Sequence, residues 1–198
     1  SLHREECISI TKNITPLKAL LDKYKEAEVR EVLSLFFCPK NSDVETFLRD
    51  KAITFEKASR ARTYLILDEE ALTDGKINII AYFTVSMKAL NLREGISKNV
   101  RKHLDGLGNK QGSTFVVYLI GQLGKNDNYR SEIDGKELIA MAIATIKEAY
   151  DVVGGRYILV ECEPVPGLKK LYEDNGFTFL QESLENDSLI QFIRFIDP

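Results

Sequence analysis

The sequence contains few of the residues that build metal sites and disulfide frameworks. Its 198 residues include only three cysteines and two histidines. The cysteines, Cys7, Cys38 and Cys162, are far apart and form no C-x-x-C pair. With only His3 and His103 beside them, no zinc-binding spacing can be written. We therefore expect no metal ion, and we expect the cysteines to be small buried side chains in a reducing compartment.

Long apolar runs are also missing. No run approaches the ~18 residues of a membrane-spanning helix, and the first twenty residues lack a signal-peptide pattern. We therefore expect a cytoplasmic protein with no membrane partner. Neither sign of charge dominates, since Lys and Arg total 27, Asp and Glu total 30, and the net charge is −3. An overall electrostatic footprint for nucleic acid is absent, so nucleic acid is not expected as a partner, although a local basic groove stays open.

What is present is the composition of an ordinary globular domain, with 44% hydrophobic and 29% charged residues. No internal repeat, low-complexity tract or linker divides the chain. A chain of this length buries about 70% of its unfolded surface, so its core needs no metal or disulfide. We expect one domain over residues 1–198.

The first third of the sequence predicts helices. Thr15 followed by Pro16 is a typical helix N-cap and first helical residue, and Ser42 and Asp43 can cap a later helical segment. The hydrophobic period then changes. Two β-branched and aromatic runs, at 63–67 and 77–85, predict an antiparallel hairpin.

The second half has the most regular pattern. The near-continuous apolar run at 113–120 predicts a strand that is buried on both faces. A strongly periodic helix at 136–150 and a second apolar strand at 157–160 follow it. Strand, helix and strand within about 50 residues predict a parallel βαβ unit, and the chain closes with a helix at 168–174 and strands at 177–180 and 189–196. The fold class is therefore α/β.

The loop before the helix at 136 is the first candidate site. A loop that leads into a helix N-terminus presents unpaired backbone N–H groups, which favour an anion such as phosphate. Arg130 and Lys136 add positive charge at its edges, whereas Glu132 and Asp134 count against a phosphate. The alternative is a plain connecting loop in which Gly135 permits a tight turn.

The end of the second apolar strand and the short helix that follows it provide four further candidate residues. Tyr172 can donate a proton to a leaving group, although a lone tyrosine on a helix is more often a packed aromatic. Glu161 and Glu163 lie where ligands bind in α/β sheets, with solvated charges as the alternative. Cys162 would need a base to act as a nucleophile, and nothing places His103 near it.

Two motifs in this half resemble those of the GNAT family of N-acetyltransferases. The segment R-x-x-I-x-G, Arg130 to Gly135, resembles the acetyl-CoA-binding motif Q/R-x-x-G-x-G/A, which follows a strand and opens a helix. The segment YEDNGF, Tyr172 to Phe177, is similar to the second family signature. The order of elements also fits. The resemblance covers residues 60–198 well and the first 60 weakly.

The resemblance implies a GNAT fold: a mixed, mostly antiparallel sheet with one central, splayed parallel strand pair, flanked by helices. It implies acetyl-CoA as cosubstrate, with its pantetheine arm on the first strand of the pair and its pyrophosphate on the loop. The residues that it assigns to acetyl-CoA are Leu123, Gly124, Lys125, Arg130, Ser131, Glu132, Ile133, Asp134, Gly135 and Lys136.

The resemblance also implies a mechanism. The acceptor amine attacks the thioester directly, Tyr172 protonates the leaving thiolate, and Glu161 takes the amine proton, directly or through a water. The sequence departs from the family pattern in two places. Ile133 stands where the motif has its first glycine, and Val165 stands where an asparagine is frequent.

Our leading hypothesis is an N-acetyltransferase for a small-molecule or peptide amine. One alternative, which rests on Ile133 and Val165, is a GNAT-fold binding module without catalysis. Another is a toxin-type acetyltransferase of aminoacyl-tRNA, against which the acidic pI of about 5.6 counts. Residues 1–60 would form a helical segment on the acceptor side. The apolar strand at 189–196 could pair across a homodimer or be covered within the chain.

Overall fold

The computed structural model describes residues 10–197, so that His3 and Cys7 lie outside the described residues. The described chain divides into two compact units. Unit 1 comprises the residues up to Tyr82 together with Gly124–Asp134, and unit 2 comprises Phe83–Leu123 together with the residues from Gly135 onward.

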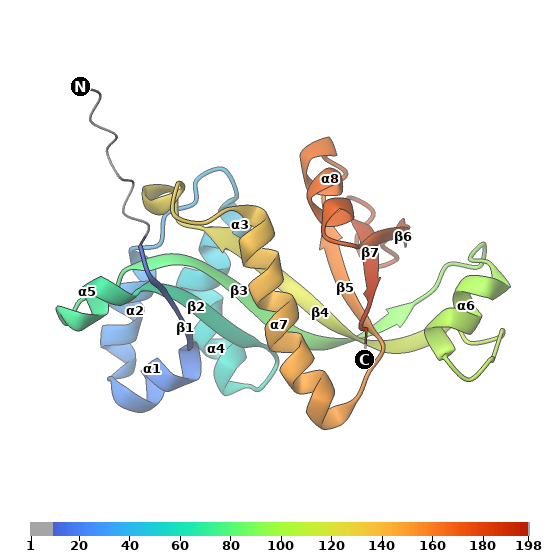
Figure 1. The fold of residues 1–198 in the computed structure, drawn as a ribbon, viewed down its shortest axis with the longest axis horizontal. Helices are drawn as coiled ribbons and strands as arrows, with labels where there is room; N and C mark the ends of the chain where they lie inside the picture. Colours follow the sequence, from blue (N-terminus) through green and yellow to red (C-terminus); the bar gives the residue numbers. More distant parts are fainter. Residues whose placement is uncertain (1–9, 198) are drawn as a thin grey trace, which may run out of the picture. The chain divides into compact units, whose positions relative to one another are not determined.

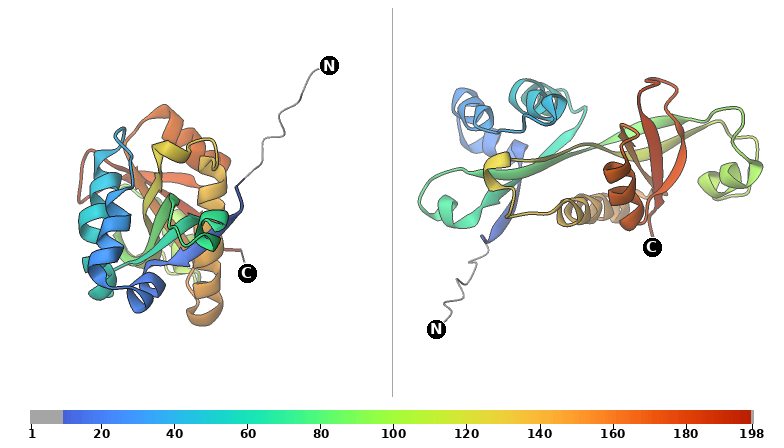
Figure 2. Two further views of the ribbon diagram at one scale, coloured as in Figure 1. Left: turned by 90° about the vertical axis from the view of Figure 1, so that its left-hand side faces the viewer. Right: turned by 90° about the horizontal axis from the view of Figure 1, so that it is seen from above.

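Unit 1 is mainly helical and contains two whole strands and the start of a third. Its elements are β1 (Lys12–Pro16), α1 (Leu17–Lys23), α2 (Glu26–Ser34), α3 (Ser42–Thr46), the π-helical turn η1 (Phe47–Lys51), α4 (Ala52–Lys57), β2 (Arg62–Asp68), α5 (Glu69–Thr73), the start of β3 (Ile79–Asn91) and the 3-10 turn η2 (Asp127–Tyr129). The helices α1, α2 and α4 lie on one side of these strands (Figure 2). Leu17, Leu33, Phe36, Leu65 and Tyr82 are fully buried in the core between the helices and the strands.

Unit 2 contains the rest of β3 and the predicted βαβ arrangement. Its further elements are α6 (Lys98–Asp105), β4 (Thr114–Lys125, which ends in unit 1), α7 (Gly135–Val153), β5 (Tyr157–Cys162), α8 (Pro166–Asp174), β6 (Thr178–Glu182) and β7 (Ile190–Phe195). The helix predicted at 136–150 and the strand predicted at 157–160 are therefore confirmed as α7 and β5.

The strands form one mixed sheet in the order β1-β2-β3-β4-β5-β7-β6 (Figure 1). The β4–β5 pair is parallel, and β1–β2, β5–β7 and β6–β7 are antiparallel. The predicted fold class, a mostly antiparallel mixed sheet with one parallel pair flanked by helices, is confirmed. Within the described residues, no helix is both long enough and apolar enough to span a bilayer.

The first third of the chain differs from the prediction of helices alone. Residues 12–16 form β1, which pairs with β2 along its whole length. Pro16 is the N-cap of α1 and Thr15 makes no cap, because Pro16 itself is still extended. Asn41, in place of Ser42 or Asp43, caps α3 by accepting a hydrogen bond from the Val44 N–H group at 3.2 Å.

Two strand predictions in unit 2 are corrected. The first half of β4 is not buried on both faces, since Val116 is 67% exposed. The apolar run at 189–196 does not form a free edge, because β7 lies between β5 and β6. Phe192 pairs with Val160 on one side and with Phe179 on the other. Pairing across a dimer through this strand is therefore excluded by its place inside the sheet.

Candidate active site

The parallel strands of unit 2 pair over only three positions. The register joins Tyr118 to Ile158, Leu119 to Leu159, and Ile120 to Val160. Within unit 2 both strands continue beyond this point, β4 to Leu123 and β5 to Cys162, and they diverge (Figure 1). The strand pair is therefore splayed, as the resemblance predicts. The β4 backbone beyond Ile120 is not paired with β5, so its N–H and C=O groups on that side can bond an extended ligand.

The 19-residue helix α7 begins at Gly135. The first N–H groups of a helix lack intrahelical partners and carry the positive end of the helix dipole. A Cβ atom at Gly135 would lie 3.2 Å from the Leu171 side chain of α8. Its φ angle is not in the left-handed region, so glycine here serves close approach to α8 and not the tight turn that the sequence suggests.

The turn that precedes α7 belongs to unit 1 and is anchored there by its backbone. Asn126 is buried, and its N–H and side-chain amide donate to the carbonyls of Ile80 and Ile79, both at 2.8 Å. The Asp127 N–H donates to the Phe37 carbonyl at 2.7 Å. These bonds fix the start of the turn, so the position of the motif depends on the core of unit 1.

The polar side chains of this turn mostly bond to one another. Arg130 forms an ion pair with Asp127 at 2.7 Å, and Lys125 donates to the Ile133 carbonyl at 3.2 Å. The Ser131 hydroxyl donates to the Glu132 carboxylate at 3.3 Å. The two cations therefore stabilise the conformation of the turn in the structure.

Ile133 fits this turn without backbone strain. Its side chain is only 2% exposed. Among the described residues other than glycine, Ser59 alone has a positive φ angle, so Ile133 adopts an ordinary backbone conformation. Isoleucine can therefore replace the family glycine at this position, because its side chain is buried and its backbone is not strained.

Tyr172 lies in an aromatic cluster of unit 2. Its side chain is 7% exposed, and its ring packs against Phe177 and Phe192 with centroid distances of 5.7 and 6.1 Å. Burial, together with the nearby Cys162 sulfur, raises the pKa of the phenol well above its ordinary value. Within the described residues 10–197, the Tyr172 hydroxyl group makes no hydrogen bond. Tyr172 therefore keeps its proton at neutral pH.

Cys162 is not suited to nucleophilic chemistry. Burial raises the pKa of its thiol to about 11; Lys169 lowers this pKa and Glu163 raises it. The thiolate is the reactive form, and it is scarce at neutral pH when the pKa is this high. Cys38 is also buried, and burial raises the pKa of its thiol as well.

We predict that Cys162 reacts with iodoacetamide at pH 8 at least a hundredfold more slowly than a free cysteine, because its thiolate is rare and covered. Mass spectrometry of the peptide that contains Cys162, after quenching and digestion at successive times, measures this rate. The same reaction in urea is the control, since unfolding restores an ordinary thiol. Rapid modification of Cys162 in the folded protein would contradict the assignment.

Glu161 is held by several donors. Lys88 on β3 binds it at 2.9 Å, the Gln191 side-chain amide donates to it at 2.7 Å, and the Ser183 hydroxyl donates at 3.4 Å. Lys88 also binds Glu185 at 2.8 Å. Burial lowers the pKa of Lys88, but its bonds to Glu185 and Glu161 outweigh this effect and raise the pKa above its ordinary value. Direct proton abstraction by Glu161 would have to displace one of these donors.

The hydrogen bonds continue from Glu161 across the sheet. Gln191 stands beside Glu161 in the β5–β7 register and beside Gln181 in the β6–β7 register. The Gln181 side-chain amide donates to Gln191 at 2.7 Å, and its oxygen accepts from the Arg93 N–H at 2.9 Å. Lys88, Gln181 and Gln191 were not predicted from the sequence. The signal that could have indicated the glutamines is a polar residue within an apolar strand, and the structure buries both side chains.

We predict that Glu161→Gln lowers the free energy of unfolding by about 2 kcal/mol at pH 7, because mostly buried Lys88 loses a charged partner. Because the pKa of Lys88 is raised in the folded protein, the stabilisation by its ion pairs is complete below pH 10.5. It is lost as the pH rises through the folded-state pKa. Urea unfolding at pH 7 and at about pH 11 checks both statements. Glu185→Gln is the control: Glu185 is 60% exposed, and we expect a smaller loss.

No protein-family model matches the sequence, and no curated protein matches it. Solved structures do match. A bacterial toxin superposes with a TM-score of 0.69 and 14% identity, covering 94% of this chain and 92% of that chain. A KacT mutant with tyrosine replaced by phenylalanine superposes with a TM-score of 0.66 and 18% sequence identity, covering 92% of this chain and 94% of that chain. AtaT complexed with acetyl-methionyl-tRNAfMet superposes with a TM-score of 0.64 and 17% sequence identity, covering 94% of each chain.

These similarities extend over nearly the whole chain at low identity, so they establish the fold. The chain has the GNAT-type fold that its two motifs predict.

Proposed function

We propose that this chain is an acetyl-CoA-dependent N-acetyltransferase and that its acceptor is the amino group of an aminoacyl-tRNA. The end of the β4–β5 pairing after Ile120 and Val160 carries the proposal. Beyond this point the extended β4 backbone of unit 2 is not paired with β5 and can bind a thioester-bearing arm. The helix that follows β4 begins with N–H groups suited to a phosphate.

In this proposal the pantetheine arm bonds to the β4 backbone from Gly121 to Leu123, as an added strand would. The pyrophosphate lies at the first-turn N–H groups of α7, at Gly135 and Lys136. The other motif residues, within Gly124–Asp134, belong to unit 1. Their contacts with acetyl-CoA remain predictions from the resemblance.

The acceptor amine attacks the thioester carbonyl directly, and the thiolate of CoA leaves. Tyr172 supplies the proton to this thiolate, and its raised pKa means that the phenol is protonated at neutral pH. Glu161 takes the amine proton through a water, since Lys88 and Gln191 already bind its oxygens. Positioning of the amine against the thioester contributes more than either proton transfer.

The choice of acceptor is supported by the AtaT structure, which is a complex with acetyl-methionyl-tRNAfMet and covers 94% of both chains. AtaTR has been solved bound with acetyl-CoA, and an AtaT mutant toxin with tyrosine replaced by phenylalanine has been solved bound to acetyl-CoA and the C-terminus of the antitoxin AtaR. These structures weigh against the expectation that nucleic acid is not a partner, which rested on net charge alone. The alternative of a binding module without catalysis rests on Ile133 and Val165. The argument from Ile133 is weakened, because this side chain is buried without backbone strain.

The direct test is transfer of radiolabelled acetyl groups from acetyl-CoA to three acceptors: methionyl-tRNA, deacylated tRNA and methionine amide. We expect rapid acetylation of methionyl-tRNA, slow acetylation of methionine amide and none of deacylated tRNA, which lacks the amine. Acetylation of methionine amide alone would refute the tRNA acceptor. No transfer to any amine would refute the enzymatic function.

A further inference from the structure

The segment between β3 and β4, Leu92–Ser113, carries α6 and is called the α6 arm below. It contains five Lys or Arg residues and two Asp or Glu residues, whereas the whole chain has a net charge of −3. Figure 2 shows α6 at the far ends of β3 and β4 within unit 2. The α6 arm is thus a basic element in an acidic protein.

The α6 arm is fixed to unit 2 by specific contacts. Within the arm, the Arg101 guanidinium donates to the carbonyls of Ile96, Gly112 and Arg93 at 3.1, 2.7 and 2.9 Å, which fixes the conformation of the arm itself. One face of α6 places Val100 and Leu104 against the hydrophobic core of this unit. A surface on α6 therefore has a defined orientation within unit 2.

The opposite face of α6 carries two exposed lysines, of which Lys102 lies in the last turn, where the helix dipole favours a cation. Lys98 and Lys102 are exposed, and their spacing of four residues brings like charges together, which disfavours a helix. Lys98 is also the first residue of α6, at the positive end of the helix dipole. Neither lysine has an acidic partner among residues 10–197. Helix stability therefore disfavours Lys98 and its spacing from Lys102, and an anionic partner that contacts both lysines would offset this cost.

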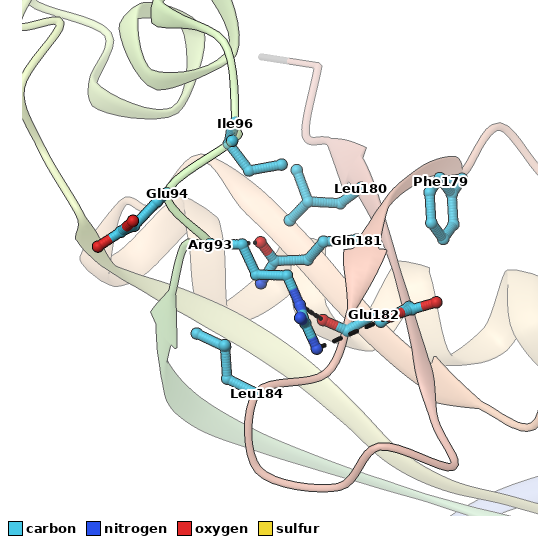
Figure 3. A pocket seen from close by; sticks show the side chains of 9 residues that line it. Arg93, Glu94, Ile96, Phe179, Leu180, Gln181, Glu182 and Leu184 are labelled. Carbon is cyan, nitrogen blue, oxygen red and sulfur yellow. Dashed lines mark hydrogen bonds and ion pairs between the residues drawn. The ribbon is translucent and has the colours of Figure 1, made fainter.

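A pocket of about 580 Å³ lies at the base of the α6 arm, between the β3–α6 connection and β6 (Figure 3). Phe179 on its wall is 51% exposed and packs edge-on against Phe192 with a centroid distance of 5.8 Å. Exposed aromatic rings stack with unpaired bases. Carboxylates of Glu94 and Glu182 also line the pocket, so it suits a base better than a phosphate.

We infer that the α6 arm and this pocket form the docking surface for the RNA of the acceptor, an inference that rests on the proposed function. The cations on α6 contact the phosphodiester backbone, and an unpaired base stacks on Phe179. The pocket is joined to the proposed active site, since Arg93 at its edge connects to Glu161 through Gln181 and Gln191. The RNA end is thereby held beside the strand that carries Glu161.

Binding of deacylated tRNA by the double variant Lys98→Gln/Lys102→Gln tests the phosphate contacts. At about 0.1 M salt we expect roughly tenfold weaker binding or more, and a plot of log K against log salt that is shallower by about 2. The matched control is Lys51→Gln/Lys76→Gln, which removes the same charge from exposed lysines of unit 1. Equal affinity and equal slope in the two double variants would overturn the proposal.

Phe179→Leu tests the stacked base, because it keeps an apolar side chain against Phe192 and removes the ring. We expect roughly tenfold weaker tRNA binding with little change in the salt slope. Unchanged binding would overturn the role of the pocket. Equally strong competition by polyglutamate would show an unspecific or acidic-protein surface and would also overturn the proposal.

Acetylation of methionine amide separates this inference from the proposed function. Lys98→Gln/Lys102→Gln and Phe179→Leu are expected to acetylate methionine amide at the wild-type rate and methionyl-tRNA with a raised KM, whereas the control Lys51→Gln/Lys76→Gln should resemble the wild-type protein with both acceptors. Wild-type protein that acetylates the amide but does not bind tRNA overturns the docking surface and leaves acetyl transfer intact. If the wild-type protein acetylates nothing, the proposed function fails, and binding of deacylated tRNA still decides whether the α6 arm is an RNA surface.

Discussion

Tyr172→Phe is expected to lower the kcat of acetyl transfer about a hundredfold to a thousandfold, because the leaving thiolate loses its proton donor. The affinity for acetyl-CoA should change less than about twofold, since the ring keeps its packing against Phe177 and Phe192. Stability should also be nearly unchanged, because the hydroxyl makes no hydrogen bond within the described chain. Steady-state kinetics with titration calorimetry measures both quantities.

The pH dependence adds a second criterion. The pKa of Tyr172 is raised by burial, so the donor stays protonated through neutral and mildly alkaline pH. Tyr172 should therefore cause no alkaline decline of the wild-type rate below about pH 10. Tyr157→Phe is the matched control, since Tyr157 is a partly buried tyrosine with a raised pKa on β5. Equal losses of kcat in the two variants would contradict the role of Tyr172.

Gly124→Ala is expected to lower the free energy of unfolding by about 2–3 kcal/mol through overpacking. A Cβ atom at this position would lie 2.7 Å from Cε1 of fully buried Tyr82 and would also collide with Val44. Tyr82 cannot easily move, because its hydroxyl donates to the Val44 carbonyl at 2.6 Å. The midpoint of thermal unfolding should fall by about 5–10 °C.

Gly167→Ala is the control for this change, since a Cβ atom there meets nothing within 4 Å and its φ angle is not positive. We expect stability close to wild type for that variant. If Gly124→Ala is as stable as wild type but does not bind acetyl-CoA, then Gly124 serves the ligand, as the motif suggests, and the packing explanation is wrong.

The elements with a strong local pattern were predictable from the sequence. In α7, Leu138, Ile139, Ala142 and Ile146 recur at helical spacing, and the structure buries all four. β1 was missed because Pro16 suggests a helix start, while the pairing that makes residues 12–16 a strand comes from β2, far along the chain. The exposure of Val116 also depends on which elements cover the sheet, and a run of apolar residues does not contain that information.

The candidate site was predictable only in outline. The positions of Tyr172 and of the splayed strands followed from motif order. The environment of Glu161 did not, because Lys88 is 73 residues away in the sequence and meets it only through the sheet. The burial of Ile133 could not be predicted either, since the sequence shows that the family glycine is missing but not where the isoleucine side chain lies.

Calorimetric titration of the wild-type protein decides whether this fold binds acetyl-CoA. Acetyl-CoA, CoA and ATP are titrated under one condition. We expect micromolar binding of acetyl-CoA and CoA and no comparable binding of ATP, which has phosphates but no pantetheine arm to pair with β4. Equal binding of all three would mean a general phosphate site, and no binding of acetyl-CoA would contradict the proposed function.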